Sequence, residues 1–466
     1  MKLRNVLTAL FATASILPGY SKVSMPAIFS NGMVLQQLSD ASIWGSTTKH
    51  GGVVTITTSW NNKKYTVKAG SDGTWRTKVQ TPKYGGPYKI TISDGEVLTL
   101  SDVEIGEVWL CSGQSNMEMR VWGRQGGDNM IGAMDAIVAK EHPEIRIFNV
   151  GHKGAGTPQT DCQGNWKGAT TENIADFSAT AFFFAKKLNE VLDGVPIGLV
   201  HSSVGGSVVQ AWMSKESLQP WDGDEKINNR SGLYNGMIAP LVGYTIKGTI
   251  WYQGEANRET ASYYTKLFST MVADWRQKWG EGEFPFYFAQ IAPFNYNSKN
   301  DGMNENSAYL REAQVKSLDV IPNSGMSILM DIGDSRTIHP ANKEEVGKRF
   351  AYLALGKTYG KKGFPTTGPI YKEMKVNGKE VELFFDNVGF GLTTMHEHLG
   401  GFQVAGEDKQ FYNANARLGK DKKTVIVTSD RVPNPVAVRY AFKDYVKGTL
   451  YNIYGLPASS FRTDNW

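Results

Sequence analysis

Three short motifs supply the residue types of acyl-transfer chemistry. Residues 113–117 are Gly-Gln-Ser-Asn-Met, residues 251–255 are Trp-Tyr-Gln-Gly-Glu, and residues 338–340 are Ile-His-Pro. Together they offer a serine as nucleophile, a histidine as base, and polar donors that can hydrogen-bond a developing oxyanion. The motifs lie far apart in the chain, so only the fold can bring them together. Their residue types predict a serine esterase.

Each motif follows a stretch whose residues predict a buried strand. Continuous apolar runs bounded by turn residues are typical of parallel strands that are covered on both faces. The expected strands are 108–111, 197–200, 246–251, 286–291 and 328–332, and the expected helices are 178–192, 262–278, 308–318 and 343–355. This alternation predicts a parallel sheet with right-handed crossovers and helices on both faces. Ligands bind such sheets at the carboxyl ends of the strands, where all three motifs fall.

The regions on either side have the pattern of β structure. Short β-like runs at 53–58, 65–67 and 88–92 are separated by turns rich in Asn and Gly. Similar runs return after residue 360, with no long helical pattern among them. We predict four segments: a signal peptide at 1–20, an N-terminal β domain at 21–105, a catalytic α/β domain at 106–359 and a C-terminal β domain at 360–466. Both β domains are expected to be sandwich-like.

The first residues have the pattern of a secretion signal. Lys2 and Arg4 precede a short apolar run at 6–17, which Pro18 and Gly19 end. The run is too short to span a bilayer comfortably, and no later stretch reaches the length of a membrane span. The pattern predicts an exported protein, periplasmic or extracellular, that is not stably inserted in the membrane after signal removal. Retention as an uncleaved anchor is the alternative.

Composition and scattered motifs exclude other classes. The net charge is only +5, from 50 basic and 45 acidic side chains, and no basic stripe with interleaved aromatics occurs, which argues against nucleic acid as a partner. Cys111 and Cys162 are the only cysteines, and we expect two buried thiols rather than a disulfide. The segment 396–398, His-Glu-His, resembles a metal clip but has no third ligand, so we expect a surface loop and no bound metal.

Ser115 and His339 are the strongest candidates for nucleophile and base. Ser115 follows the expected strand 108–111 but lacks the second glycine of a Gly-x-Ser-x-Gly elbow, which argues against an α/β-hydrolase. His339 lies between an expected strand and an expected helix, at the same edge of the sheet as Ser115. His201 also ends a strand and is the rival base.

The ordered set of motifs resembles the SGNH-type sialate O-acetylesterase family and related carbohydrate acetylesterases. Besides the three motifs above, the set includes the loop 205–207 (Gly-Gly-Ser), the opening segment 29–36 and the closing segments 401–406 and 455–464. The resemblance covers nearly the whole mature chain. It implies an SGNH-hydrolase-like, flavodoxin-like parallel sheet with helices on both faces and a β domain on each side.

The resemblance also implies a role for each matching residue. Ser115 becomes the nucleophile and His339 the base. Many SGNH hydrolases place an aspartate three residues before the histidine, to orient its ring. Arg336 stands at that position here. Asp334, five residues before His339, is assigned as the third member, and a backbone carbonyl that orients the ring of a Ser–His dyad is the alternative.

The expected oxyanion hole and substrate contacts follow from the same motifs. The backbone N–H of Ser115, the backbone N–H of Gly206 and the side chain of Gln253 are the expected donors. Glu255 is expected behind them, ordering Gln253 or an arginine. Candidate substrate contacts are Asn116, Arg120, Trp212 and Arg258. Trp122 and Trp221 are further candidates to line the site, and Arg124 is a further cation that could recognise a carboxylate.

The implied reaction is hydrolysis of an acetyl ester through an acetyl-enzyme, with no metal or organic cofactor. The resemblance implies O-acetylated sialic acid as the substrate. Acetylated plant polysaccharides, such as xylan or xyloglucan, are the alternative. A non-catalytic carbohydrate-binding protein is the alternative of another class, and a peptidase is disfavoured because acetylesterase motifs span the chain. The sequence leaves the oligomeric state open.

Overall fold

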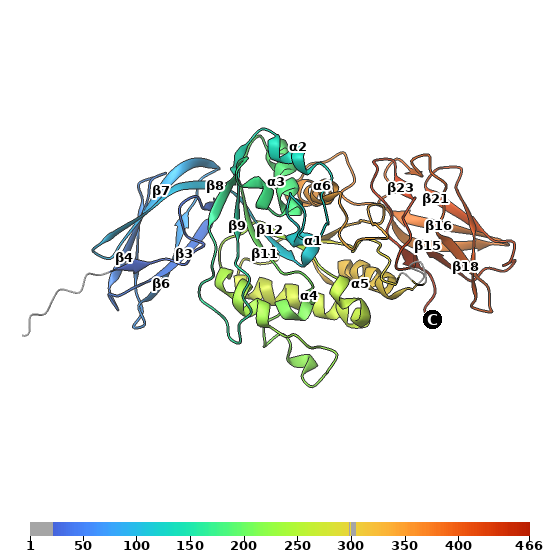
Figure 1. The fold of residues 1–466 in the computed structure, drawn as a ribbon, viewed down its shortest axis with the longest axis horizontal. Coiled ribbons are helices and arrows are strands. Elements are labelled where there is room, and N and C mark those ends of the chain that lie inside the picture. Colours follow the sequence, from blue (N-terminus) through green and yellow to red (C-terminus); the bar gives the residue numbers. More distant parts are fainter. Residues whose placement is uncertain (1–21, 298, 300–303) are drawn as a thin grey trace, which may run out of the picture.

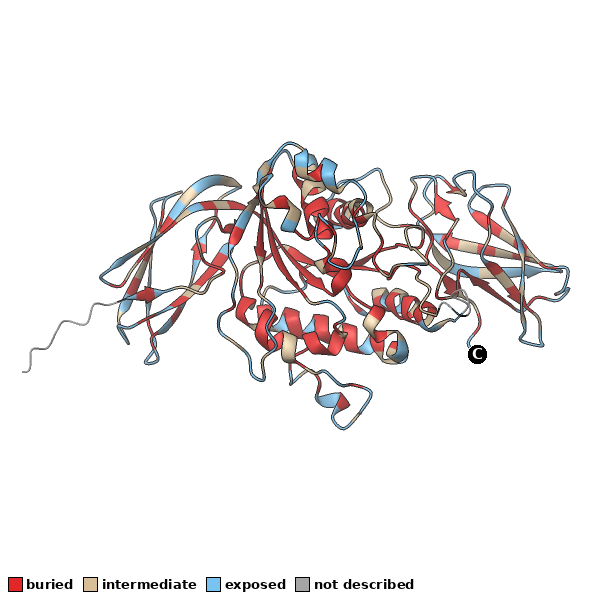
Figure 2. Cartoon of the chain, in the orientation of Figure 1, coloured by how far each residue is buried: buried red, intermediate tan, exposed pale blue. Residues whose placement is uncertain are grey.

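The computed structural model describes residues 22–297, 299 and 304–466, so the predicted signal peptide at 1–20 lies outside the described residues. Figure 1 shows three parts side by side along the long axis of the molecule. An N-terminal β region and a C-terminal β region flank a central α/β part. Figure 2 shows that buried residues are most concentrated in the central sheet and the helices against it.

The central sheet carries the expected parallel strands. Its strands follow the order β10-β9-β11-β8-β12-β13-β14, and all neighbours are parallel except β10 and β9. The strands are β8 (Val97–Gly113), β9 (His142–Asn149), β10 (Trp166–Ala169), β11 (Ile197–Ser203), β12 (Gly248–Tyr252), β13 (Phe286–Ala289) and β14 (Ser324–Ser327). A flavodoxin-like sheet has its second strand beside its first. With β9 and β10 set apart as additions at one edge, β8 and β11 are the first and second strands and lie side by side, and the order β11-β8-β12-β13-β14 is the flavodoxin-like order 2-1-3-4-5, as expected.

The last parallel strand lies earlier in the chain than predicted. The expected strand 328–332 is not one, although Ile328, Leu329 and Met330 are buried. The strand that pairs with β13 is Ser324–Ser327, which contains small residues. A Cβ on Gly325 would lie 2.8 Å from Leu353 Cδ2 and 3.1 Å from Tyr287, so a larger residue here would have to displace these side chains. The apolar pattern therefore identified the buried segment but not the strand.

Helices cover both faces of this sheet. Figure 1 shows α3 (Ala179–Val191) and α6 (Lys343–Leu353) on one face and α4 (Ala261–Trp279) and α5 (Asn306–Val320) on the other. The side chain of Ser178 caps α3 by accepting a hydrogen bond from the N–H of Ala181. Gly280, in the left-handed region at φ +69°, ends α4. All four helices were predicted from sequence within a few residues.

The N-terminal β region shares a strand with the centre. Strand β8 has 17 residues and crosses the predicted boundary between residues 105 and 106. Its first half pairs with β7 (Gly85–Ser93) and β2 (Val34–Gln36), and its second half pairs with β11 and β12. The remaining strands of this region are β1 (Val23–Ser24), β3 (Asp40–Thr47), β4 (Val53–Thr58), β5 (Lys64–Lys68) and β6 (Thr74–Gln80). Ser115 therefore follows a strand that belongs to the sheets of both the N-terminal region and the central part.

The C-terminal region is built from two four-stranded sheets and one short strand pair. One sheet has the order β15 (Ile370–Asn377), β16 (Glu380–Asp386), β21 (Thr424–Thr428), β20 (Asn415–Leu418). The other has the order β19 (Phe411–Asn413), β18 (Phe402–Ala405), β22 (Ala437–Tyr440), β24 (Phe461–Arg462), and β17 (Leu392–Thr393) pairs with β23 (Tyr451–Asn452). The β pattern of the sequence after residue 360 is therefore present.

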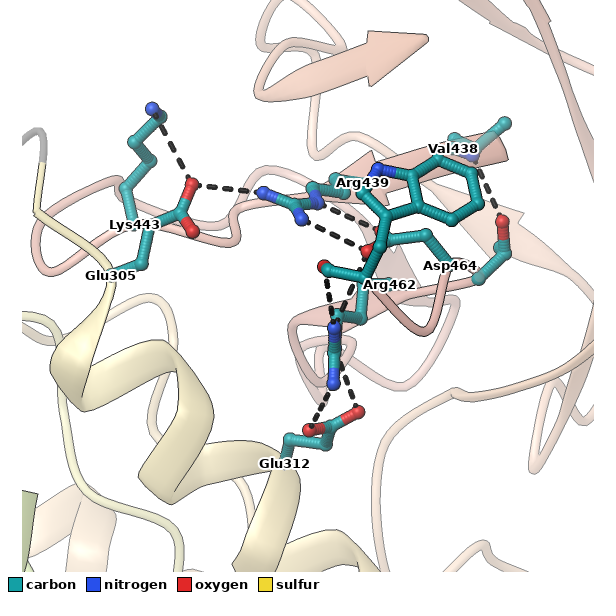
Figure 3. Close-up of polar contacts among 9 residues, drawn as sticks. Glu305, Glu312, Val438, Arg439, Lys443, Arg462 and Asp464 are labelled. Atoms are coloured by element: carbon teal, nitrogen blue, oxygen red, sulfur yellow. Dashed lines mark hydrogen bonds and ion pairs between the residues drawn. The ribbon is translucent and has the colours of Figure 1, made fainter. Parts of the chain in front are cut away.

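A cluster of ion pairs fixes the C-terminal region to helix α5 (Figure 3). Arg439 contacts both carboxylate oxygens of Asp464, at 2.8 and 2.9 Å, and reaches Glu305, just before α5, at 2.9 Å. Arg462 pairs with Glu312 of α5 at 3.1 Å. The Asp464 side chain is fully buried, so its bidentate pair is shielded from water and salt. The cluster therefore joins helix α5 to the C-terminal region.

Other expectations concern single features. Cys111 and Cys162 are both buried free thiols, as predicted, and burial raises the pKa of the Cys162 thiol to about 12. The segment 396–398 lies in an exposed turn. Among the described residues, we find no helix whose length and apolar character would let it cross a membrane.

Gly113, at the end of β8, is the position where the fold tolerates only glycine beside the site. Its φ is +140°, and an added Cβ would lie 2.1 Å from the carbonyl oxygen of Tyr252 on β12. We expect Gly113→Ala to destabilise the protein by about 3 kcal/mol, from backbone strain plus the clash. Thermal unfolding should show a melting temperature lowered by several degrees. Gly156→Ala, where an added Cβ meets nothing within 4 Å, is the matched control, and equal effects of both substitutions would contradict this reading.

Candidate active site

Ser115 begins the short helix α1 (Ser115–Glu118), immediately after β8. The turn between them is held against β12, since the N–H of Gln114 donates to the carbonyl oxygen of Tyr252 at 2.9 Å. Ser115 is 6% exposed, so the residue is nearly buried. As the first N–H of a helix, its backbone N–H has no carbonyl partner within α1. It therefore remains a candidate donor to an oxyanion.

The structure brings Ser115 and His339 together. The Ser115 Oγ lies 2.9 Å from His339 Nε2, although the two residues are 224 positions apart in the chain. His339 is 8% exposed, and its backbone N–H donates to the Thr337 Oγ1 at 3.1 Å. At this distance the serine hydroxyl can donate its proton to the ring.

The carboxylate at the other ring nitrogen is Asp128, not Asp334. Asp128 Oδ2 accepts a hydrogen bond from His339 Nδ1 at 2.7 Å, and Asp128 Oδ1 accepts one from the Thr337 hydroxyl at 2.6 Å. Asp334 instead binds Arg336, accepting from its backbone N–H at 2.7 Å and from its guanidinium at 3.3 Å. The assignment of Asp334 is corrected on this geometry, because a two-residue turn closes its carboxylate onto Arg336.

Sequence reasoning missed Asp128 because no spacing rule relates it to His339. The two residues are 211 positions apart, and Asp128 follows the glycine pair 126–127 in a loop between α1 and α2 (Ala133–Val138). An aspartate after glycines is most simply read as a turn residue. Only the fold places this loop beside the loop that carries His339.

The electrostatic surroundings favour a neutral imidazole. Burial, followed by the nearby Arg124 guanidinium, lowers the pKa of His339, and the hydrogen bond and charge of Asp128 oppose this shift. For Asp128, burial alone would raise the pKa, but hydrogen bonds from Thr337 and His339 leave it lowered overall. At neutral pH the ring is therefore free of a second proton and the aspartate is charged. This is the protonation state that a general base with an orienting acid requires.

Asn116 lies beneath the nucleophile and connects all three motifs. Its side-chain N–H groups donate to Glu255 Oε1 at 2.6 Å and to the carbonyl oxygen of Ile338 at 3.1 Å. Its side-chain oxygen accepts from the ammonium of Lys343, the first residue of α6. Asn116 is completely buried, so the expectation that it contacts substrate was wrong. Its contacts instead set the relative positions of Ser115 and His339, which are the neighbours of Asn116 and Ile338.

Two buried charged groups flank this asparagine. Burial raises the pKa of Glu255 and lowers the pKa of Lys343 to about 7, and each group's charge opposes the shift of the other. Glu255 therefore orders Asn116, not Gln253 or an arginine as expected. Lys343 was missed because a lysine at the start of a predicted helix is usually solvated. A buried amide held between an anion and a cation has one preferred orientation, which keeps the motif loops in register.

Gln253 does not offer a free donor to Ser115. Its Nε2 donates to the carbonyl oxygen of Ser207 at 3.1 Å and to Asn257 Oδ1 at 2.7 Å, and its Oε1 accepts from the Tyr264 hydroxyl at 3.0 Å. Gln253 is also completely buried. Its predicted place in the oxyanion hole therefore does not fit this geometry. It supports the loop 205–207 from behind.

The glycine turn beside Ser115 supplies the other candidate donor, the backbone N–H of Gly206. A Cβ on Gly205 would lie 3.5 Å from Ser115 Cβ, so this glycine lets the turn approach the nucleophile closely. The Gly205 N–H donates to Glu118 Oε2 at 2.7 Å. Gly206, the predicted donor, follows in the left-handed region at φ +72° and is exposed. A cavity of about 420 Å³ is lined by this turn and by Asn229, Arg230, Gly232 and Leu233.

The other three residues predicted to contact the substrate interact with protein groups instead. Trp212 is completely buried and its indole N–H donates to Ser207 Oγ at 2.9 Å, so it cannot contact a substrate. Arg120 is paired with Asp176 at 2.9 Å on the surface. Arg258 is paired with Glu259 at 3.2 Å and lies over the Tyr296 ring. Of the two remaining tryptophans, Trp221 is buried and Trp122 is 41% exposed.

The rival base His201 is a buried structural residue. Its Nε2 accepts from the Ser203 hydroxyl at 2.7 Å, and its Nδ1 is 2.8 Å from Asn149 Oδ1. Burial lowers the pKa of its ring to about 4. Both ring nitrogens are occupied, and no contact joins the ring to Ser115. In the part of the chain that the structure describes, no cluster of three or more metal-binding side chains occurs.

Comparisons with known proteins agree on one family. The sequence pattern of the family described as carbohydrate esterase, sialic acid-specific acetylesterase matches residues 105–355. Sialate O-acetylesterases from human and rat are 31% and 29% identical to the chain, over 74% of it and over 73% and 75% of their own lengths. A carbohydrate acetylesterase structure from Xanthomonas citri superposes with a TM-score of 0.87 at 36% identity, covering 96% of this chain and all of that one.

Asp128 and Asp334 give opposite expectations for the same substitution. We expect Asp128→Asn to lower kcat/KM for an acetyl ester by about 1000-fold or more, because the orienting anion and the imidazolium's partner are lost together. Asp334→Asn, which only breaks the contact with Arg336, should stay within a few-fold of the wild type. Steady-state hydrolysis of p-nitrophenyl acetate by the two folded variants measures this. A larger loss in Asp334→Asn would restore the original assignment.

The dependence of kcat/KM on pH tests the contact between His339 and Asp128 independently. Because the base must be unprotonated, kcat/KM should rise with pH through the pKa of His339 and then level off, with a midpoint below the ordinary histidine value of about 6.5. Asp128 raises this pKa, so the residual activity of Asp128→Asn should have its midpoint at still lower pH.

Proposed function

The chain belongs to the sialic acid-specific acetylesterase family of carbohydrate esterases and is a carboxylic ester hydrolase, and from this premise we propose that it removes O-acetyl groups from sialic acids with Ser115 as nucleophile. The observation that carries the proposal is the position of one ring. His339 lies 2.9 Å from the Ser115 hydroxyl and 2.7 Å from the Asp128 carboxylate. A base placed between a nucleophile and an orienting acid is the arrangement that acyl transfer needs.

The first half of the reaction makes an acetyl-enzyme. His339 Nε2 takes the proton of Ser115 as Oγ bonds to the carbonyl carbon of the acetyl group, whose oxygen becomes an oxyanion. The backbone N–H groups of Ser115 and Gly206 supply donors for that charge. Asp128 stabilises the imidazolium that forms. The imidazolium then gives its proton to the sugar oxygen as the ester C–O bond breaks, which leaves acetyl-Ser115.

The second half releases acetate by the same route in reverse. A water molecule enters where the sugar oxygen left, and His339 Nε2 takes one of its protons as its oxygen bonds to the acetyl carbon. Collapse of the second tetrahedral intermediate breaks the bond to Ser115 Oγ, which recovers its proton from the ring. The buried bonds of Asn116 to Glu255 and to Ile338 keep the two reacting side chains in register through both halves.

Sialic acid is favoured as the sugar by the curated relatives, which are named sialate O-acetylesterases. The similar structure from Xanthomonas citri is named only as a carbohydrate acetylesterase, without a sugar. Acetylated xylan and xyloglucan are therefore the substrates to compare against. The carbohydrate-binding alternative is not favoured, because family and neighbours are esterases.

Substrate and nucleophile are tested together by acetate release. We expect the wild type to release acetate from O-acetylated sialic acid with a higher kcat/KM than from acetylated xylan or xyloglucan oligosaccharides. Ser115→Ala should lower the rate by at least about 1000-fold while the protein stays folded, since the attacking oxygen is gone. Acetate is measured by an enzyme-coupled assay, and circular dichroism checks the fold.

A fluorophosphonate probe gives the control. Labelling of the wild type should disappear in Ser115→Ala and persist in Ser262→Ala, an exposed serine on α4. Full acetate release by Ser115→Ala would overturn the nucleophile, and faster hydrolysis of the plant oligosaccharides would overturn the sugar.

A further inference from the structure

Arg124 lies over the reacting groups, and the reaction described above does not use it. It belongs to the loop between α1 and α2, and its Nη1 is 2.7 Å from His339 Nε2 and 3.3 Å from His339 Nδ1. Its Nη2 lies 3.8 Å from the position that a Cβ on Gly205 would take, on the glycine turn beside Ser115. The guanidinium therefore lies between the base and the proposed oxyanion donors, where a bound sugar would meet it.

No carboxylate among the described residues forms an ion pair within 4 Å with this guanidinium, although Asp128 is near enough for the charge of Arg124 to lower its pKa. Three other arginines of the central part each have an acidic partner: Arg120 pairs with Asp176, Arg230 with Asp222, and Arg258 with Glu259. A partly buried arginine is usually compensated by an acid, because removing its charge from water is costly. Arg124 is held only to an imidazole that needs to be basic.

Its present contact also competes with catalysis. A neutral imidazole that donates through Nδ1 to Asp128 has one lone pair, on Nε2. Both the Ser115 hydroxyl, at 2.9 Å, and the Arg124 guanidinium, at 2.7 Å, point donors at that nitrogen. A ligand that drew the guanidinium away would leave the lone pair to Ser115 and would remove a positive charge from the base.

Resting on the proposed function, we propose that Arg124 recognises a carboxylate of the acetylated sugar, and that this contact moves its guanidinium off His339. A carboxylate fits a guanidinium through two parallel hydrogen bonds, which a neutral sugar hydroxyl cannot provide. The loop can adjust, because Gly123, Gly126 and Gly127 surround Arg124 and Gln125, and a Cβ on Gly126 or Gly127 would meet nothing within 4 Å. Arg124 would thus select acidic over neutral acetylated sugars.

The carboxylate could come from two sources with the same chemistry. One is the carboxyl group of the acetylated sialic acid itself. The other is a uronic acid next to an acetylated neutral sugar, as in a glucuronic acid-bearing xylan oligosaccharide. The experiment includes both, each paired with a matched substrate in which the charge is masked or missing.

The test measures acetate release from O-acetylated sialic acid and from the methyl ester of its carboxyl group. We expect the wild type to favour the free acid by about 10- to 100-fold in kcat/KM, the range of a charge-assisted hydrogen-bonded contact. Arg124→Met should lose that preference: the free acid loses its contact, whereas the methyl ester should be hydrolysed at least as fast as by the wild type, because no guanidinium then competes for His339 Nε2. Arg124→Lys, which keeps the charge but not the fork, should recover part of it. Acetylated xylan oligosaccharides with and without glucuronic acid form the second substrate pair.

The matched control is Arg120→Met, which removes a neighbouring surface arginine that is already paired with Asp176. It should leave both substrate preferences unchanged. If the wild type favours neither acidic substrate, or if Arg124→Met lowers activity equally on the charged and masked forms, the inference is overturned while the esterase proposal stands. If the wild type releases no acetate from any of these sugars, the proposed function itself fails, and the inference fails with it. A preference for the acid only in the xylan pair identifies the uronic source.

Discussion

The hydrogen bond between the Ser115 hydroxyl and His339 Nε2 is the contact on which the site depends, and the sheet has to be arranged to permit it. Ser115 follows β8, whereas His339 lies in the segment after β14, three strands away across β12 and β13. At about 4.8 Å per strand, that separation is roughly 14 Å. The chain covers it because β14 ends at Ser327, which leaves residues 328–342 to cross the carboxyl edge of the sheet before α6 begins. Leu329 and Met330 of this segment are buried and hold it against the core.

Holding two such distant loops in register requires buried polar groups. Asn116 bonds the 251–255 loop through Glu255, the 338–340 loop through the carbonyl of Ile338, and the start of α6 through Lys343. Burying an acid and a lysine costs free energy that well-packed apolar residues would not, so this cluster is better explained by the geometry it fixes than by stability. Further contacts link these loops to the C-terminal region through α5. Gln314 of α5 donates to the carbonyl oxygen of Gln253, and the ion-pair cluster of Arg439 and Asp464 joins α5 to the C-terminal region. The C-terminal sheets thus brace the site without reaching it.

The sequence predicted the elements better than it predicted the contacts between them. Helices α3 to α6 were found because apolar residues at helical spacing are a local signal. Strand β14 was misplaced because the sequence Ser-Gly-Met-Ser carries little apolar signal. Asp128 was missed and Asp334 chosen because nearness in sequence is a poor guide to which loop faces a ring. Gln253 and Trp212 were misread because their residue types fit both a ligand contact and a buried support, and only burial separates the two.

The central claim is that Ser115 carries the acetyl group between the two halves of the reaction. Mass spectrometry of the enzyme quenched with acid during turnover of an acetyl ester tests this directly. The account predicts one added acetyl group on the peptide that contains Ser115, formed and lost at rates consistent with turnover, and absent from Ser115→Ala. Rapid acetate release with no acetyl group on that peptide at any time, under conditions that preserve a serine ester, would contradict it.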